Sequence, residues 1–473
     1  MNTRFPRRTF LRSHLGAILT TAVAPAFLRS AILGRAGEVG PNSRIQVGCI
    51  GLGPQGRGVM GGFLTQSDVR ITGLCDVATP HLEAAGAQVR TRYQDGPCPA
   101  FGDFRELLDQ PGIDAVLIAT PDHWHVPVAL AAVRAGKDLY LEKPLGLSVA
   151  EALALLRAVR RQQRIFQFGT QQRSAGEFHR AVSLVRAGRI GALRAIHVWA
   201  PASRPGGSIR PAPVPPGWNY DFWLGPAPET PCTEGRLADD PDTGAWKTWW
   251  FRYDYTLGFL SGWGIHPLDI ALWGHPSMLE DTVEVEGRAA FPTEGACDTA
   301  IAWDVRFRFA DGVTLVFKGT PNGDDTPGEL TDLTAWHDRY GGIEGHGTAF
   351  EGTEGWVCVH RGAVRASNPR WIEEPVPTPA RPPIRSTHHV RNFLDGIRTR
   401  VPAVCPIEDA VQADTLCHLA DIATRVERPL RWDPRRQRFV NDPDADRRLA
   451  LRPMRAPWQD LVPAHRANRP QPG

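Results

Sequence analysis

The sequence predicts an α/β fold, with an N-terminal doubly wound parallel sheet followed by an α/β domain that has a large, open and mostly antiparallel sheet. Two apolar runs, Ala115–Ala119 and Leu139–Leu141, have the length and bulk of buried parallel strands. An amphipathic segment between them reads as a crossover helix that ends at Gly136. Beyond about residue 192 the pattern changes to strands of alternating polarity, which indicates a second domain.

Composition limits the classes of partner. The chain has 473 residues, 42% of them hydrophobic, which is enough for the cores of two or three domains. Its net charge of +3 is small, so we predict neither a nucleic-acid partner nor recruitment to a membrane. The eight cysteines form no CxxC pair and have no metal-type spacing, so we predict no disulfide framework and no metal site.

The first 36 residues are predicted to be a signal segment. Pro6–Arg12 has a twin-arginine pattern, and a mild apolar run follows it. The alternative is a disordered basic arm. The pattern favours export by the twin-arginine route to the periplasm, with cleavage among the small residues near Ser30–Gly37. The apolar run is too short and too rich in Ala and Thr for a comfortable span, so we expect no membrane span after signal removal.

A glycine-rich turn opens the predicted first domain, residues 42–165. The strand Arg44–Ile50 runs directly into Gly51–Gly56, a G-x-G-x-x-G pattern. Gly51 permits a tight turn, Gly53 lets a pyrophosphate approach the backbone, and Gly56 lets the next helix pack closely. Pro54 is tolerated because its missing N–H would be unpaired at a helix start. The alternative is a glycine loop that serves only the turn.

An acidic residue lies at the position where a dinucleotide-binding domain binds the ribose. The second strand ends in Asp76, twenty positions after Gly56. An acid there binds the ribose diol and repels a 2′-phosphate, so NAD is favoured over NADP. The sequence therefore predicts a nucleotide-binding domain of strand-helix repeats. Its other predicted elements are helices at Pro80–Tyr93, Phe104–Leu108 and Ser148–Arg161, and a strand at Arg164–Thr170.

Ligands gather at the carboxyl ends of parallel strands, at the point where the strand order reverses. Thr120–His125 and Glu142–Pro144 each follow a predicted strand, so we expect both to face one crevice. Lys143, at a strand end and followed by a proline, is placed for chemistry.

The second domain is predicted over residues 166–432, and residues 433–473 are predicted to be an extended tail. Residues 201–252 carry five tryptophans and little periodicity; they read either as a loop packed on its own core or as aromatic faces that stack on sugar rings. The remaining predicted elements are helices at Phe178–Ala187, His388–Thr399 and Ile407–Val426, and strands at Ala192–Ala200, Trp303–Phe309, Val313–Lys318, Gly355–His360 and Ala363–Ala366.

A second chemical stretch runs from Gly258 to Trp273. His266 and Asp269 are three positions apart, so they share a face of a helix that starts near Pro267. Taken alone, His266 is more often a structural histidine, and Asp269 a cap or a satisfied buried acid.

The glycine turn, the run from Ala119 to Pro144 with its Glu-Lys-Pro end, and the stretch Gly262–Gly274 together resemble the Gfo/Idh/MocA oxidoreductase family. The resemblance covers essentially the whole chain after the signal segment. It implies a Rossmann domain, an α/β domain with an open sheet, and NAD(P)-dependent redox chemistry on sugars or cyclitols. By the same resemblance, Lys143 contacts the substrate near the nicotinamide and His266 is the base at the reacting hydroxyl.

The resemblance also implies a wider set of site residues. Those expected to bind substrate are Asp269, Arg173 and Trp263. Those expected to line the cofactor are Gly51, Gly53, Pro54, Gln55, Gly56, Asp76, Thr120, Pro121, His123, His125, Glu142 and Lys143. Many members of the family carry an aspartate four residues before the histidine, and this chain has Gly262 there. Without that carboxylate the imidazolium is less favoured, and His266 is expected to be the weaker base.

Three functions remain open from the sequence. The first is an NAD(P)-dependent oxidoreductase acting on a secondary hydroxyl of a sugar, cyclitol or sugar derivative, with a tightly held and recycled cofactor, because free NAD is scarce outside the cytoplasm. The second is an NAD-dependent glycosidase or lyase that works by transient oxidation. The third is a non-catalytic sugar-binding protein. An open sheet face also predicts a homo-oligomer, a dimer or tetramer.

Overall fold

A computed structural model describes residues 43–237, 248–321 and 328–463. The predicted signal segment, residues 1–36, and Trp246 lie outside the described residues. The chain from Ile45 onward forms one compact unit.

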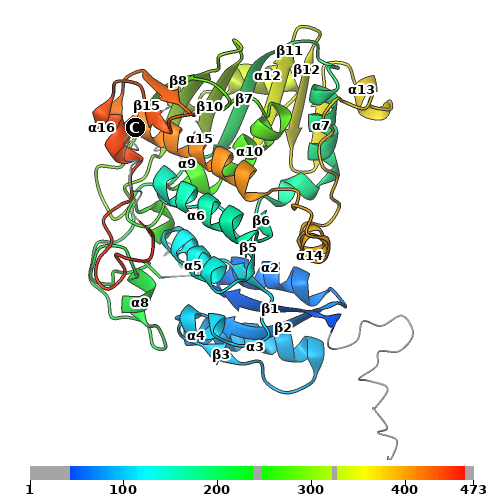
Figure 1. The fold of residues 1–473 in the computed structure, drawn as a ribbon. Coiled ribbons are helices and arrows are strands. Elements are labelled where there is room, and N and C mark those ends of the chain that lie inside the picture. Colours follow the sequence, from blue (N-terminus) through cyan, green and yellow to red (C-terminus); the bar gives the residue numbers. More distant parts are fainter. Residues whose placement is uncertain (1–42, 238–247, 322–327, 464–473) are drawn as a thin grey trace, which may run out of the picture. The chain divides into compact units, whose positions relative to one another are not determined.

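The first sheet has six parallel strands in the order β3-β2-β1-β4-β5-β6 (Figure 1). This is the order of a doubly wound Rossmann sheet, in which the direction of winding reverses between β1 and β4. Its elements are β1 (Ile45–Ile50), α2 (Pro54–Leu64), β2 (Val69–Cys75), α3 (Thr79–Tyr93), β3 (Ala100–Phe101), α4 (Phe104–Leu108), β4 (Ala115–Ile118), α5 (Asp122–Arg134), β5 (Asp138–Leu141), α6 (Val149–Gln162) and β6 (Phe166–Phe168). Because β6 belongs to this sheet, the domain extends beyond the boundary predicted at residue 165.

The local sequence explains these elements. Every residue of β4 and β5 is buried, as expected for central strands covered on both faces. Helix α6 begins where Ser148 predicts it, with the Ser148 hydroxyl accepting a hydrogen bond from the Glu151 N–H at 3.2 Å. Cys49 and Cys75 are buried in this domain, and Cys358 is buried in the second, as their apolar surroundings predict.

The second sheet has nine strands in the order β13-β12-β11-β7-β10-β9-β8-β14-β15. All its strand pairs are antiparallel except β7 with β10. The strands are β7 (Leu193–Pro201), β8 (Val283–Ala290), β9 (Ala302–Arg308), β10 (Thr314–Thr320), β11 (Gly347–Gly352), β12 (Trp356–His360), β13 (Ala363–Ala366), β14 (Leu430–Asp433) and β15 (Arg438–Phe439). The helices are η2 (Gln171–Ser174), α7 (Gly176–Arg186), α8 (Tyr220–Leu224), η3 (Thr248–Phe251), α9 (Phe259–Gly262), α10 (Ile265–Gly274), α11 (Gly328–Thr331), α12 (Thr334–Tyr340), α13 (Arg370–Glu373), α14 (His389–Thr399), α15 (Ile407–Val426) and α16 (Pro443–Arg448).

The two faces of the large sheet differ. Helices α7, α10 and α15 pack on one face, where Ile196 and Val198 of β7 join the main core. Figure 1 shows α15 lying between the large sheet and α6, and it contacts both. On the opposite face Trp199 packs with Tyr340 of α12. Farther along that face, β8 and β9 pair opposite charges across the strands, with Glu284 opposite Arg308, Glu286 opposite Arg306 and Arg288 opposite Asp304.

Two predictions about the second domain need correction. Strands β8 and β11 were not among the predicted strands, because the outward residues of β8 are mostly charged and β11 begins and ends in glycine. The tail predicted to be extended from residue 433 is partly folded, since β15 and α16 lie in it. Its buried apolar residues explain the folding: Phe439 stacks edge-on to Trp432, and Trp458 packs against Trp124 and Phe222.

No helix among the residues described is long and apolar enough to cross a membrane.

The cap at Ser148 gives a test of the local account. Ser148→Ala removes the acceptor for the Glu151 N–H, and we expect it to lower the free energy of unfolding by about 1 kcal/mol. Urea unfolding followed by tryptophan fluorescence measures the change. Ser67→Ala, in an exposed turn, is the matched control and should change stability by less than about 0.5 kcal/mol. Equal effects of the two substitutions would contradict the assigned cap.

Candidate functional site

A cavity of about 780 Å³ opens at the carboxyl ends of the central strands of the first sheet. Residues of the second domain form its opposite wall. Thirteen of the predicted site residues line it: Gly51, Gly53, Pro54, Gln55, Gly56, Asp76, Thr120, Pro121, His125, Glu142, Lys143, Trp263 and His266. The two stretches expected to share a crevice therefore do so, and Lys143 and His266 lie in the same cavity although they are far apart in the chain.

The three glycines of the turn have different surroundings. A Cβ on Gly51, where φ is +83°, would lie 2.5 Å from the Ala119 carbonyl carbon, and one on Gly56 would lie 2.0 Å from the Gly51 oxygen. These two glycines are required by the fold itself. A Cβ on Gly53 would meet nothing nearer than His81, at 3.9 Å. Gly53 also begins α2 without a side-chain cap, so the first N–H groups of that helix are available to an anion at this wall.

Asp76 is held in a fixed orientation at the end of β2. Its Oδ2 accepts a hydrogen bond from the Leu52 N–H at 2.6 Å, and its Oδ1 accepts one from the Ala78 N–H at 2.8 Å. The His81 ring lies 3.3 Å from Oδ2. Each carboxylate oxygen has two lone pairs, so the group can still accept from a diol that enters the cavity. The open glycine wall, the uncapped helix start and this carboxylate together fit a dinucleotide.

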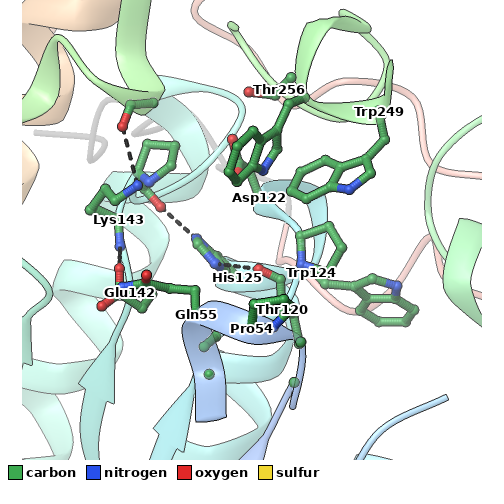
Figure 2. A pocket seen from close by; sticks show the side chains of 18 of the residues that line it. Pro54, Gln55, Thr120, Asp122, Trp124, His125, Glu142, Lys143, Trp249 and Thr256 are labelled. Atoms are coloured by element: carbon green, nitrogen blue, oxygen red, sulfur yellow. Dashed lines mark hydrogen bonds between the residues drawn. The ribbon is translucent and has the colours of Figure 1, made fainter. Parts of the chain in front are cut away.

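His125 joins the ends of β4 and β5. Its Nδ1 contacts the Pro144 carbonyl oxygen and its Nε2 lies 2.8 Å from the Thr120 carbonyl oxygen, as the dashed lines in Figure 2 show. Burial lowers the pKa of His125 to about 4, against the opposing effect of both carbonyls. The neutral ring carries one N–H and donates it to one of the two carbonyls at a time. The histidine therefore fixes the relative position of the two strand ends.

Lys143 and Glu142 lie side by side at the end of β5 (Figure 2). Glu142 accepts a hydrogen bond from the Gln171 amide at 2.7 Å, and burial raises the pKa of its carboxyl in spite of the nearby Lys143. The Lys143 ammonium reaches across the cavity and donates to the Gly262 carbonyl oxygen at 3.2 Å. This contact joins the strand end of the first domain to the stretch that carries His266.

His266 lies in α10 and its side chain is buried. Burial lowers its pKa well below the ordinary value, and Lys143, His346 and Arg361 lower it further. Its Nδ1 has no hydrogen-bond partner among the described residues. The ring is therefore neutral and can accept a proton, but its charged form is disfavoured. This agrees with the weaker base expected from the glycine at position 262.

Asp122 lines the cavity but was not among the predicted site residues, although its neighbours Pro121 and His123 were. It is the first residue of α5 and is 6% exposed. Burial raises the pKa of its carboxyl to about 7, while a hydrogen bond with Thr256 and the charge of Lys143 oppose the rise. Figure 2 shows Asp122 beside Thr256. The cavity thus contains an acid that exchanges its proton near neutral pH.

Three predicted site residues do not line the cavity. Asp269 was expected to bind substrate, but it is fully buried and both of its carboxylate oxygens accept from Arg173, at 2.8 and 2.6 Å. Arg173, also expected to bind substrate, is buried in this ion pair and contacts Asp409 as well. The alternative that Asp269 is a satisfied buried acid describes its place in this structure.

The third is His123, which was expected to line the cofactor. Its side chain turns away from the cavity: Nε2 lies 3.0 Å from the Trp223 carbonyl oxygen and the ring packs against Tyr255. On a helix, neighbouring residues point in different directions, so only His125 of the two histidines reaches the lining.

The tryptophan-rich region packs on a core of its own, which was one of the two alternatives predicted for it, and it also reaches the cavity. Trp223, Leu237 and Tyr255 form a small core of their own. Trp218, Trp223, Trp249 and Trp250 also line the cavity. Trp263 adds another indole face, with the Lys143 Nζ 6.0 Å and the Arg361 Cζ 5.4 Å from its ring centroid. Arg361, in the turn between β12 and β13, had no signal in the sequence because nothing in a short hairpin turn indicates which cavity it reaches.

The fold and the site define a class of protein, the two-domain oxidoreductases in which a Rossmann domain and an α/β domain share one cavity. Two family models match the chain. One is described as an oxidoreductase family with an NAD-binding Rossmann fold and matches residues 45–170; the other, the C-terminal alpha/beta domain of that family, matches residues 198–328 and 374–460. The chain belongs to the Gfo/Idh/MocA oxidoreductase family.

Relatives and solved structures agree with this assignment. A curated relative from Shewanella sp. (strain ANA-3), named Glycosyl hydrolase family 109 protein 2, is 31% identical over 160 residues, which are 31% of this chain and 35% of the relative. The aldose-aldose oxidoreductase from Caulobacter crescentus has a similar fold, with a TM-score of 0.54, 20% identity and coverage of 82% of this chain and 99% of the other. The WlbA dehydrogenase from Bordetella pertussis, solved with NADH and UDP-GlcNAcA, has a TM-score of 0.58, 14% identity and coverage of 82% and 98%. The chain spans about a third of the length of the curated relative.

The buried ion pair gives a prediction about stability. Arg173→Met leaves the Asp269 carboxylate buried without its partner, and we expect it to lower the free energy of unfolding by about 3–5 kcal/mol. Urea unfolding measures the change, and Arg160→Met is the control, because the Arg160–Glu408 pair is exposed and is expected to contribute less than about 1 kcal/mol. The double variant Arg173→Met/Asp269→Leu should recover most of the loss. Similar effects of the two single substitutions would contradict a structural role for the pair.

Asp122 gives a prediction about pH. The pKa of Asp122 is about 7 in the folded protein and 3.8 ordinarily, so the unfolded chain loses this proton at a lower pH than the folded protein does. The stability that the protonated carboxyl contributes is therefore lost as pH rises from about 4 to about 7. Asp122→Asn cannot lose a proton. The difference in melting temperature between Asp122→Asn and the natural protein should therefore grow in favour of the variant from pH 5 to pH 8. The corresponding change in relative free energy of unfolding is on the order of 2–4 kcal/mol. If the difference in melting temperature between the two proteins stays constant from pH 5 to pH 8, the raised pKa of Asp122 is contradicted.

Proposed function

We propose that the protein is an NAD-dependent oxidoreductase that acts on a secondary hydroxyl of a sugar, a cyclitol or a sugar derivative. The observation that carries the proposal is that Lys143 and His266 line the same cavity as the glycine turn and Asp76. A catalytic pair and a dinucleotide cradle thus share one space.

The residues of the first domain have distinct roles in holding the dinucleotide. The N–H groups at the start of α2 and the open face of Gly53 receive the phosphates, and Asp76 accepts from the ribose diol. The carboxylate repels a 2′-phosphate, which favours NAD over NADP. When bound, NAD supplies hydride transfer to and from the substrate carbon.

The second wall supplies the proton chemistry. A neutral His266 accepts the proton of the reacting hydroxyl, and the Lys143 ammonium stabilises the charge that develops on that oxygen. The Gly262 carbonyl holds the ammonium on this side of the cavity. Tryptophans 249, 250 and 263 offer apolar faces on which a sugar ring stacks, and they exclude water from the reacting atoms.

The comparisons support the general chemistry. Solved structures of similar fold include a dehydrogenase with NADH bound, the protein GenD2 with NAD bound, a putative myo-inositol dehydrogenase and an aldose-aldose oxidoreductase. Retention of the cofactor is part of the proposal, because the twin-arginine pattern predicts export to the periplasm, where released NADH would not be reoxidised readily. The reaction then returns the hydride within the same site.

A second candidate is an NAD-dependent glycosidase. In such an enzyme transient oxidation of the sugar would allow elimination of the leaving alcohol, water would then add to the double bond, and the oxidation would be reversed. Two observations favour it: the partial relatives named Glycosyl hydrolase family 109, and the tryptophan faces along the cavity.

Association into a homo-oligomer is also proposed. Two copies that met through β8 and β9 would place rows of Glu and Arg side chains against each other, so this interface would be polar and sensitive to salt.

The proposed function predicts that the purified protein binds NAD and that Lys143→Met keeps NAD binding but lowers turnover by at least about a hundredfold, because the charge on the substrate oxygen is no longer stabilised. Nicotinamide absorbance of the protein as isolated measures retention. A panel of aldoses, inositols and p-nitrophenyl glycosides measures turnover, and Lys318→Met, on the opposite face of the large sheet, is the control.

The outcomes separate the candidates. Conversion of an aldose or inositol supports the oxidoreductase. Release of p-nitrophenol without net NADH supports the glycosidase. Failure to bind NAD, or unchanged turnover in Lys143→Met on a substrate that the natural protein converts, would contradict both.

A further inference from the structure

The space beside Gly262 is the starting observation. A Cβ built on Gly262 would meet nothing nearer than the Phe259 ring, at 3.7 Å, and the residue lines the cavity. The backbone there does not require glycine, since its φ is outside the left-handed region. A larger side chain would therefore fit, and the chain leaves this volume to whatever enters the cavity.

Basic groups surround that space. The Lys143 ammonium donates to the Gly262 carbonyl oxygen at 3.2 Å. The Arg361 guanidinium lies over the adjacent Trp263 ring, 5.4 Å from its centroid, and the His346 ring packs against the same indole at 4.9 Å. The Lys143 Nζ lies 6.0 Å from that centroid as well. Lys143 and Arg361 thus both lie near the Trp263 ring in the cavity.

The acidic groups of the cavity are distributed unevenly. Glu142 and Asp122 both lie close enough to Lys143 for its charge to oppose the rise of their pKa values. Glu177 accepts from the Gly362 N–H of the β12–β13 turn at 3.2 Å. Within the ranges that the structure describes, Arg361 forms no ion pair with a carboxylate. The charge of Arg361 is therefore not balanced by an ion pair there.

We infer that this space is an anion-binding subsite and that the substrate is an acidic sugar whose carboxylate lies between Arg361 and Lys143 while its ring stacks on Trp263. The inference rests on the proposed function, because it takes the cavity to be a carbohydrate site. A guanidinium presents a planar pair of donors that matches a carboxylate, whereas a neutral hydroxyl would leave Arg361 without a counter-charge. The indole face suits the apolar face of a pyranose.

The test compares matched sugars on the full-length protein saturated with NAD. Isothermal titration measures the affinity for the methyl glycosides of glucuronate, galacturonate and mannuronate, each against its neutral hexoside. We expect at least one uronide to bind about tenfold or more tightly than its neutral counterpart, and the ratio to fall as salt is raised, because exposed charge pairs are screened. Glucose 6-sulfate and glucose 6-phosphate test other anions at the same position.

Two pairs of variants locate the effect. Gly262→Asp places a carboxylate in the subsite and should bring the ratio of affinities to about one, whereas Gly262→Ala fills part of the same space without charge and should retain the preference. Arg361→Gln should lower the ratio, and Arg361→Lys should retain more of it. NAD titration of every variant checks that the first domain is intact.

Each outcome decides a separate point. Equal binding of uronides and neutral hexosides, or equal effects of Gly262→Asp and Gly262→Ala, would overturn the subsite and leave the proposed function standing. Tighter binding of glucose 6-sulfate or 6-phosphate than of every uronide would overturn the carboxylate assignment. If NAD binds and none of the sugars does, the carbohydrate assignment fails, and this inference fails with it.

Discussion

One buried guanidinium connects the parts of the site. Arg173 follows the last strand of the Rossmann sheet, and it pairs with Asp269 of α10 and Asp409 of α15 while donating to the Val404 carbonyl. Its side chain is 1% exposed and that of Asp269 is 0% exposed. A charge pair removed from water to this degree tolerates little displacement, because any separation leaves a buried charge without compensation. The ion pair therefore ties the helix that carries His266 to the segment that follows the nucleotide-binding sheet.

The glycine at position 262 affects the distribution of charge within the cavity. Where Gly262 stands, the chain has no carboxylate beside His266, and burial, together with the basic neighbours of the histidine, keeps its pKa well below the ordinary value. The acid with a pKa of about 7, Asp122, comes from the opposite wall at the start of α5. The two groups thus come from different domains. The same glycine leaves the space on which the acidic-sugar subsite depends.

Much of this could be predicted from the sequence because it depends on local patterns. The buried strands before Thr120 and Glu142, the glycine turn and the Ser148 cap each follow from a few adjacent residues, and strand order then brings their ends together. The pairing of Asp269 with Arg173 could not be predicted, because helical spacing shows which residues share a face and not which partner lies opposite. Arg361 lies in the hairpin turn between β12 and β13. Its place depends on the register of these strands, and the alternation of polar and apolar residues does not determine that register. The folded tail was missed because its buried residues, such as Trp458, are scattered among arginines and prolines.

The most direct measurement of the central claim is a crystal structure of the full-length protein with NAD and a bound sugar. The account predicts that the dinucleotide lies along the wall formed by Gly53 and Asp76, with its nicotinamide end beside Lys143 and His266, and that a hydroxyl of the sugar contacts both side chains. A dinucleotide bound elsewhere, or a sugar whose hydroxyls contact neither Lys143 nor His266, would contradict it.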